Sequence, residues 1–227
     1  MNNGISITEV EDTFSFKDMI KTKSYHFIKR VFDLLCSTIG CIALIFISII
    51  IKIVYMINGD FHTIFYTQDR IGKDGKLFRL YKYRTMVPNA DVYLTYLLEN
   101  NEDLRLEYEE NKKLANDPRI TKAGKLIRRL SIDELPQMIN VFLGDMTIIG
   151  NRPYLPKERK DMRGFYWDII KTKPGITGYW QVSGRSDTTF LTRLKLEQYY
   201  SKHYGLKMDA KIFFKTFRAV IGGKGAK

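Results

Sequence analysis

The sequence predicts an α+β fold that is mostly helical, with a membrane-embedded helix near the N-terminus and a compact domain after it. An uncharged apolar run at residues 34–51 predicts the membrane helix. Two β-type segments joined by a glycine turn predict one small β-hairpin, and helical periodicity predicts amphipathic helices that suit a membrane interface. We therefore divide the 227 residues into a tail (1–28), a membrane helix (29–58) and a compact domain (59–227).

The membrane helix has three possible placements. As a straight helix the apolar run reaches roughly 27 Å, the lower edge of what crosses a bilayer. A buried core helix and a simple spanning helix are both compatible with it, but basic residues flank both ends. A re-entrant helix, which enters one leaflet and returns, would place both basic ends on one face, and we favour it. Residues 29–87 contain no proline, so Ser37, Gly40 and Ser48 are the candidates for its bend.

The composition limits the partners and the metal sites. The formal charge is +12, which indicates acidic partners such as nucleic acid, anionic lipid headgroups or phosphorylated substrates. The two cysteines, Cys36 and Cys41, are five residues apart in the apolar run and point in different directions on a helix, so we expect no disulfide. The three histidines lack the spacing of zinc ligands.

The predicted hairpin brings two cations to one face. Residues 63–68 and 77–86 are the expected strands, and alternate side chains of a strand share a face. Lys82 and Arg84 therefore point the same way near a strand end, where they could hold a phosphate. A solvated hairpin rim is the alternative.

Helices follow the hairpin. Residues 89–115 predict a polar, acid-rich helix interrupted near Asn100, whose acids serve as surface charges. Residues 191–204 and 207–221 predict amphipathic helices, and the second interleaves aromatic residues with cations. That pattern suits a membrane interface or a helix packed on a core.

The densest candidate site is the segment RRLSIDELP, residues 128–136. Asp133 and Glu134 follow Arg128 closely at an expected helix start, where free backbone N–H groups attract anions. A carboxylate that attacks a phosphate needs cations and a metal to neutralise the phosphate oxygens. Arginine supplies a bidentate clamp, and a second carboxylate can bind Mg²⁺. Asp133 is thus a candidate nucleophile and Glu134 a candidate metal ligand.

A structural alternative explains the same acids. Ser131 and Glu134 have the spacing of a capping box, opening a helix that runs to about Leu143 and ends at Gly144. Asp133 would then only complement the helix dipole.

Two loops rich in Gly and Pro lie downstream. GNRP (150–153) presents Arg152, and KPGITGYWQVSGR (173–185) offers glycines, an aromatic pair and Arg185. Such loops suit a nucleotide, with backbone and arginine for phosphate and an aromatic ring for the base. Turns that use the same residues for shape alone are the alternative.

These motifs resemble the bacterial sugar transferase family, the monotopic phosphoglycosyl transferases. The resemblance covers about residues 29–209, with the motifs in the family's order. The matching segments are KRVFD, FYTQDRIGKDGKLFRLYKYRTM, DPRITKAGKLIRRLSIDELPQMINVFLGDM, GNRP and KPGITGYWQVSGR. Many members break the membrane helix at a Ser-Pro pair, which this chain lacks.

The resemblance implies an enzyme of the bacterial inner membrane with its catalytic domain on the cytoplasmic face. Such an enzyme transfers a sugar 1-phosphate from a UDP-sugar to undecaprenyl phosphate, releases UMP, and starts exopolysaccharide, capsule or glycan synthesis. Asp133 matches the nucleophile, which forms a covalent aspartyl-phosphosugar, and Glu134 matches the Mg²⁺-binding acid. Membrane lipids are further partners, no nucleic acid is expected, and a homo-oligomer is compatible. With Arg84 from the hairpin, the substrate-binding candidates are Lys82, Arg84, Arg128, Arg152 and Arg185.

Two rival functions come from other classes. A membrane-tethered nucleic-acid-binding protein would explain the charge and a helix-turn-helix pattern around residues 127–141, but the basic residues are spread over strands and loops. A non-catalytic scaffold of a polysaccharide assembly complex need not keep Asp133, Glu134 and Arg128 together. Galactose, glucose and N-acetylated or modified hexosamines are all open as the transferred sugar.

Overall fold

The computed structural model describes residues 16–111, 114–183 and 189–221. The helices are α1 (Phe16–Ile57), α2 (Ala90–Asn100), α3 (Glu102–Asn111), α4 (Lys122–Arg129), α5 (Gln137–Leu143), α6 (Arg159–Met162), α7 (Tyr166–Ile169), α8 (Tyr179–Ser183), α9 (Phe190–His203) and α10 (Leu206–Ile221). The strands are β1 (Phe65–Ile71), β2 (Leu77–Tyr83), β3 (Thr147–Ile149) and β4 (Gly175–Thr177). The predicted mostly helical α+β fold with a long apolar N-terminal helix is confirmed.

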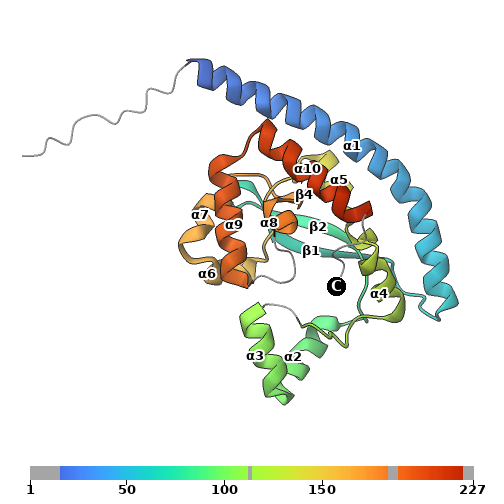
Figure 1. Ribbon diagram of the computed structural model, residues 1–227. Coiled ribbons are helices and arrows are strands. Elements are labelled where there is room, and N and C mark those ends of the chain that lie inside the picture. Colours follow the sequence, from blue (N-terminus) through green and yellow to red (C-terminus); the bar gives the residue numbers. More distant parts are fainter. Residues whose placement is uncertain (1–15, 112–113, 184–188, 222–227) are drawn as a thin grey trace, which may run out of the picture.

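The predicted hairpin is present with shifted ends. β1 and β2 pair antiparallel, and Tyr66 lies opposite Lys82. β1 continues beyond the expected end because its residues 69–71 pair with residues 77–79 of β2. A short parallel pair, β3 with β4, was not predicted. It lies beside the hairpin at the centre of the domain (Figure 1).

Helix α1 is one continuous, curved helix that runs along the outside of the domain (Figure 1). Its buried residues recur on one side from Tyr25 to Tyr55, which is the spacing of a single helix face. Because no break interrupts Phe16–Ile57, the sharp bend of a re-entrant helix is absent from this structure. Gentle curvature around a core, convex toward the outside, replaces it.

The candidate bend residues of α1 serve packing instead. A Cβ on Gly40 would lie 2.5 Å from Met138 Cγ, so Gly40 lets α5 approach α1 closely. Ser37 is fully buried, and Ser48 Oγ lies 2.7 Å from Tyr83 Oη, in hydrogen-bond contact. The three small residues therefore fit α1 to the domain along its length.

Buried polar contacts also tie α1 to the domain. Asp33 Oδ1 accepts hydrogen bonds from Thr147 Oγ1 and from the Ile148 backbone N–H, each at 2.9 Å. Arg30 donates to Val141 O at 2.7 Å. Asp209 of α10 accepts from Tyr25 and from Lys29. These contacts hold residues 25–33 of α1 against the domain.

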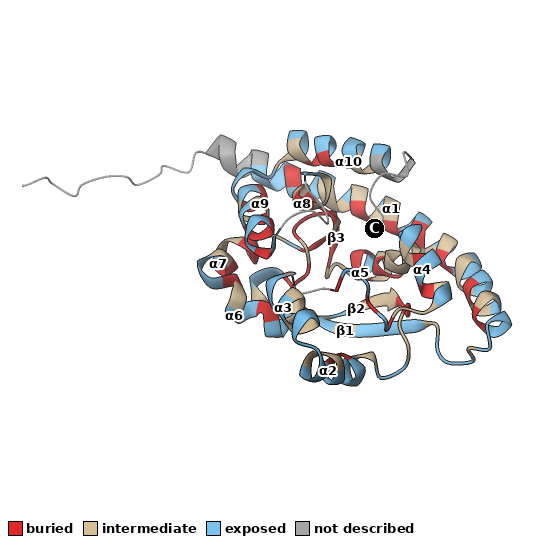
Figure 2. Cartoon of the chain, turned by 60° about the horizontal axis from the view of Figure 1, so that its bottom comes forward, coloured by how far each residue is buried: buried red, intermediate tan, exposed pale blue. Residues whose placement is uncertain are grey.

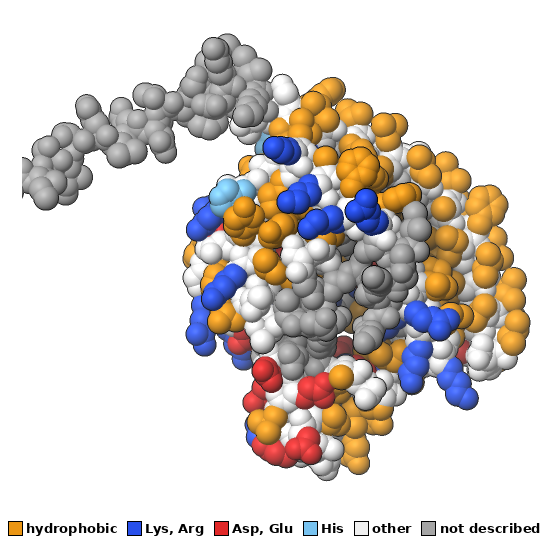
Figure 3. Space-filling model, viewed as in Figure 1, with side chains coloured by type: hydrophobic (Ala, Val, Ile, Leu, Met, Phe, Trp, Pro, Cys, Tyr) orange, Lys and Arg blue, Asp and Glu red, His pale blue; other side chains and the backbone are white. Residues whose placement is uncertain are grey.

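The opposite side of α1 is exposed and apolar. Hydrophobic side chains cover the outer edge of the arc that α1 forms (Figure 3). The exposed large residues of this face include Phe27, Val31, Leu35, Ile39, Ile42, Ile45, Phe46, Ile49, Ile50 and Ile53. Residues Thr22–Ile57 are long and apolar enough to cross a membrane. An unpaired apolar surface of this extent indicates a membrane protein.

The acidic helix predicted at residues 89–115 is two helices. α2 and α3 meet at Asn101, as the asparagines in the sequence indicated, and they project from the domain away from α1 (Figure 1). Acidic side chains gather on this projection (Figure 3). Figure 2 shows α2 largely exposed, whereas β3, at the centre of the domain, is buried along its whole length.

The core joins both sheets to the C-terminal helices. Leu80 of β2 packs with Val141 and Met146, and also with Tyr200 of α9 and Ile212 of α10. All are at most 2 % exposed. In α10, the helix with interleaved cations, Ile212 is in this core while Phe214 and Phe217 are exposed. The core-packed alternative for α10 is therefore confirmed on one side of the helix, while contact of the exposed aromatic side with a membrane interface stays a prediction.

Candidate active site

The two acids lie on a short turn between α4 and α5. Residues Ile132–Glu134 form a single 3-10 turn, and Ser131 before it has a left-handed backbone (φ 56°) and makes no capping hydrogen bond. The predicted capping box is therefore wrong. Pro136 has no N–H to continue an α-helical ladder, so α5 begins only at Gln137. Its predicted end at Gly144 is confirmed, with φ 93°.

Lys82 of β2 reaches both acids of this turn. Its Nζ donates to Glu134 Oε1 at 2.9 Å and lies 3.9 Å from Asp133 Oδ2. The fully buried Asn140 of α5 sets this contact: its Oδ1 accepts from the Tyr81 N–H at 3.1 Å and its Nδ2 donates to Arg79 O at 2.7 Å. Asn140 thus holds β2 against α5. The sequence analysis missed it because an Asn within a helix has no distinctive pattern.

The pKa values of the two acids move apart. Burial raises the pKa of Asp133, the neighbouring Glu134 charge adds to that, and Lys82 and Arg128 only partly offset it. Burial also acts to raise the pKa of Glu134, but the Lys82 charge and hydrogen bond, together with Arg152 and Gln137, hold that pKa below its ordinary value. Glu134 therefore keeps its charge to lower pH than Asp133 does. Environments that separate two carboxyl groups in this way are typical of active sites.

Arg128 is positioned by the packing of α4. Its Nε donates to Thr85 Oγ1 at 2.9 Å. Thr121 caps α4 through the Gly124 N–H at 2.9 Å, and the Thr121 N–H itself donates to Thr85 O. A Cβ on Gly124 would lie 2.0 Å from Thr85 O, so only glycine allows α4 to approach this closely. The charge of Arg128 acts to lower the pKa of Asp133.

Arg152, which follows β3, is the third cation that acts on the two acids, after Lys82 and Arg128. Its charge lowers the pKa of Glu134, and its guanidinium lies 5.7 Å from the centre of the Trp180 ring. The structure thus brings together Asp133, Glu134, Lys82, Arg128 and Arg152 from four separate segments. Arg185 lies outside the described residues.

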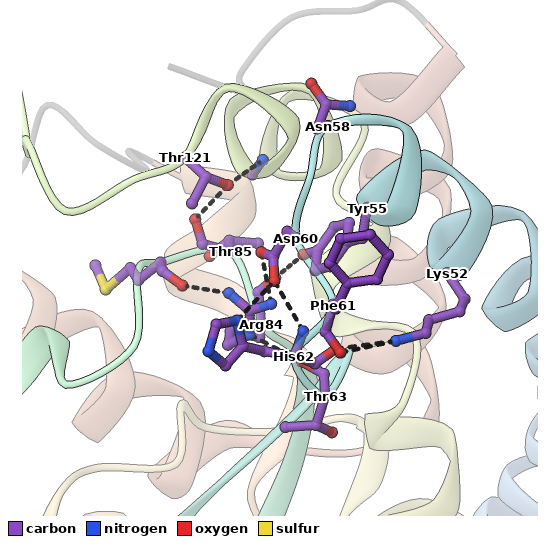
Figure 4. A network of polar contacts seen from close by, with 12 residues as sticks. Lys52, Tyr55, Asn58, Asp60, Phe61, His62, Thr63, Arg84, Thr85 and Thr121 are labelled. Atoms are coloured by element: carbon purple, nitrogen blue, oxygen red, sulfur yellow. Dashed lines mark hydrogen bonds and ion pairs between the residues drawn. The ribbon is translucent and has the colours of Figure 1, made fainter.

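Arg84 is held elsewhere, in a network of its own (Figure 4). Its guanidinium nitrogens donate to Asp60 Oδ2 at 2.7 Å, Thr63 O at 2.8 Å and Met86 O at 2.9 Å, and it lies over the Tyr55 ring. These contacts give Arg84 a structural task, and its contact with a phosphate stays a prediction. The alternation argument that paired it with Lys82 does not reach Arg84 because β2 ends at Tyr83.

The aromatic pair of the second loop is also engaged. Trp180 is 8 % exposed, with the Arg193 guanidinium 4.3 Å from its ring centre. Tyr179 packs on Tyr199, with ring centres 5.3 Å apart. Trp180 therefore acts as a platform for arginines, and stacking of a nucleotide base on it is not available in this arrangement.

The acids fit a magnesium ion that takes its other ligands from a substrate. Within residues 16–111, 114–183 and 189–221, no three His, Cys, Asp or Glu side chains gather as a complete metal cage. Mg²⁺ is commonly bound by one or two carboxylates plus substrate phosphates, and Glu134 can supply one. A magnesium ion at Glu134 therefore stays a prediction.

The helix-turn-helix interpretation gains no support from α5. Gln137, Asn140 and Val141 of α5 are all buried. A recognition helix must present side chains to a DNA groove. The exposed large side chains of α5, Phe142 and Leu143, are apolar and carry no charge for DNA.

Comparison with known proteins agrees with this geometry. A family model described as bacterial sugar transferase matches residues 24–223. The chain belongs to this family. The match includes α1 from Ser24 onward and every residue of the candidate site, so the chain is a sugar transferase by family.

Similar proteins carry more specific names. The undecaprenyl-phosphate galactose phosphotransferase of Salmonella typhimurium is 42% identical over 204 residues, which are 90% of this chain and 42% of that protein. The exopolysaccharide production protein ExoY of Sinorhizobium fredii is 36% identical over 200 residues, 87% of each chain. A UDP-N-acetylgalactosamine-undecaprenyl-phosphate N-acetylgalactosaminephosphotransferase of Aeromonas hydrophila is 32% identical over 92% of this chain and 47% of its own length. The chain thus spans less than half the length of several of its relatives.

Proposed function

We propose that this sugar transferase moves a sugar 1-phosphate from a UDP-sugar to undecaprenyl phosphate and releases UMP, as the first membrane step of exopolysaccharide, capsule or glycan synthesis. The observation that carries the proposal is the placement of Asp133, 15 % exposed at its side chain, 3.9 Å from Lys82 Nζ and close enough to Arg128 for that charge to lower its pKa. The names of the Salmonella and Aeromonas relatives support the acceptor, and the Aeromonas name supports a UDP-sugar donor.

The proposed chemistry has two displacements at one phosphorus atom. A carboxylate oxygen of Asp133 attacks the β-phosphorus of the UDP-sugar, the bond from that phosphorus to the bridging oxygen breaks, and UMP leaves with the electron pair. A phosphate oxygen of undecaprenyl phosphate then attacks the same phosphorus and releases the Asp133 carboxylate. Lys82 and Arg128 neutralise the phosphate oxygens, without which two anions would repel each other.

Magnesium completes the proposed donor site. Glu134 would hold Mg²⁺ together with substrate phosphates, and the ion would supply further neutralisation of the diphosphate. The lowered pKa of Glu134 supports this role, because a metal ligand must be ionised. Arg152 then faces the phosphate of the nucleotide half.

The membrane placement we propose uses one leaflet. α1 packs on the domain from Tyr25 to Tyr55, so a spanning orientation would draw the domain into the bilayer. With its outer apolar face embedded, α1 lies along the membrane, and the exposed Phe214 and Phe217 of α10 enter beside it. A site at the headgroup level can reach the phosphate of a lipid acceptor. Our proposal places this site on the cytoplasmic face of the bacterial inner membrane.

The test is UMP release by protein in nanodiscs with Mg²⁺, undecaprenyl phosphate and a panel of UDP-sugars. We expect release with one or a few sugars, and loss of release in Asp133→Asn. Asp103→Asn, an exposed acid on α3, is the matched control and should keep full activity. A donor labelled in the sugar phosphate, given without acceptor, should label wild-type protein but not Asp133→Asn. No UMP release with any sugar would overturn the proposal.

A further inference from the structure

Helix α9 carries a buried polar stripe. Arg193, Glu197 and Ser201 are four residues apart in turn, so they share one face of the helix, and they are 6 %, 1 % and 8 % exposed. A helix face that only filled a core would be apolar, because buried polar groups are costly unless paired. The stripe faces the segment that carries Arg152.

Two members of the stripe hold consecutive residues of that segment. Glu197 Oε2 accepts the backbone N–H of Arg152 at 3.0 Å. Ser201 Oγ pairs with Asn151 Nδ2 at 2.6 Å. The segment that presents Arg152 is therefore attached to α9 through the backbone of Arg152 and the side chain of Asn151.

The third member shares an aromatic platform with Arg152. The Arg193 guanidinium lies 4.3 Å from the centre of the Trp180 ring, and that of Arg152 lies 5.7 Å from the same ring. Burial lowers the pKa of Arg193, and the nearby Arg152 charge lowers it further, so the two cations repel each other. Within the part of the chain that the structure describes, Nε of both arginines and Glu197 Oε1 are buried without hydrogen-bond partners.

We infer that Arg193 and Glu197 are positioning residues that hold Arg152 ready for a phosphate of the nucleotide donor, an inference that rests on the proposed function. Of the two arginines, only Arg152 is partly exposed, so it is the one that an anion can reach. Repulsion between cations at this point is relieved when a phosphate binds. A guanidinium whose backbone and ring contacts are already made loses less freedom on binding.

A double-mutant cycle tests this inference. The kcat and the KM for the UDP-sugar are measured from UMP release in nanodiscs for wild type, Glu197→Leu, Arg152→Ala and the double variant. We expect Glu197→Leu to raise the KM by about 10-fold, the scale of leaving a buried backbone donor without its hydrogen-bond partner. In the Arg152→Ala background it should have no further effect, because it acts through Arg152. The same factor in both backgrounds would overturn the inference.

Conservative variants separate positioning from folding. Glu197→Gln keeps an oxygen that can accept the Arg152 N–H, so its KM should stay within about threefold of wild type. Arg193→Lys keeps the charge but loses the planar stack on Trp180, so its KM should rise. Melting temperatures are measured for every variant. If Glu197→Leu does not fold, Arg193→Lys decides, and a KM for Arg193→Lys equal to wild type would refute the positioning role.

The matched control is the next residue of α9. Gln198 donates to Asp168 Oδ2 at 2.8 Å, on a different side of the helix from the stripe. Gln198→Leu should therefore leave the KM unchanged. Wild-type protein that releases no UMP would overturn the proposed function itself, and with it this inference, whereas an active wild type with additive variants would overturn the inference alone.

Discussion

The ammonium of Lys82 donates a hydrogen bond to Glu134 Oε1 at 2.9 Å, across 52 residues of sequence. The same nitrogen lies 3.9 Å from Asp133 Oδ2. One cation from the hairpin thus serves two acids on the turn before α5. Replacement of Lys82 should affect both acids and the binding of a diphosphate.

The first prediction is that Lys82→Met lowers kcat/KM for UMP release by about 10²–10³-fold, the loss found when one preorganised charge-stabilising donor is removed. Lys82→Arg keeps the charge and should retain part of the activity. Melting temperatures of both variants should be close to wild type, because Lys82 is partly exposed. Near wild-type activity of Lys82→Met would exclude Lys82 from phosphate neutralisation.

The second prediction concerns the stability cost of Asp133. A raised pKa means that the folded state disfavours the ionised carboxyl. The loss of stability therefore begins as the pH rises through the pKa of Asp133 in the unfolded chain, and it is complete above its pKa in the folded protein. Asp133→Asn should therefore melt at the same or a higher temperature than wild type at pH 7. Below the ordinary pKa of 3.8 the difference should disappear.

Differential scanning calorimetry between pH 3 and pH 8 measures this difference, with Asp103→Asn as the control. The same pKa predicts that wild-type activity falls on the acid side at a pH above that of an ordinary aspartate. A lower melting temperature of Asp133→Asn at pH 7 would show that Asp133 is mainly a structural acid.

The third prediction separates Arg84 from the catalytic cations. Arg84→Met breaks its ion pair with Asp60, where the side chains are 10 % and 24 % exposed, and should destabilise the fold by about 3–5 kcal/mol. The KM of the protein that remains folded should be unchanged. Denaturant unfolding and kinetics at low temperature measure the two effects. A stable variant with a raised KM would instead place Arg84 in the phosphate site.

The fourth prediction concerns the outer face of α1. Ile39 and Phe46 are 71% and 64% exposed on it, and a charged group in the membrane interior costs about 2.5–3.5 kcal/mol. Ile39→Asp with Phe46→Asp should therefore weaken co-flotation with anionic vesicles by at least about tenfold. Val92→Asp, on the α2 projection, is equally exposed and should have no effect. Unchanged flotation of the double variant would exclude this face from the membrane.

The fifth prediction distinguishes one-leaflet placement from spanning. Single cysteines at Lys23 and Asn58, near the two ends of α1, are introduced into a variant with Cys36 and Cys41 replaced by Ser. Both should react with a membrane-impermeant maleimide added outside vesicles that carry the domain on their outer face. A spanning helix would protect one of the two.

Local signals in the sequence predicted many elements correctly. The glycine turn marked the hairpin, Asn100 and Asn101 marked the junction of α2 and α3, and Gly144 marked the end of α5. Each depends on the backbone preferences of a few adjacent residues, which act before any tertiary contact forms. The same local argument failed at Ser131, where Pro136 and the packing of the turn determine the backbone.

By itself the sequence determined the α+β class, the apolar helix, and the placement of Asp133 and Glu134 after two arginines. Only the tertiary structure decided that Lys82 reaches these acids while Arg84 is bound to Asp60, and that α1 is continuous along the domain. The physical reason is the distance in sequence over which each interaction acts. Backbone preferences depend on a few adjacent residues, whereas the partner of a charged side chain depends on elements that only folding brings together.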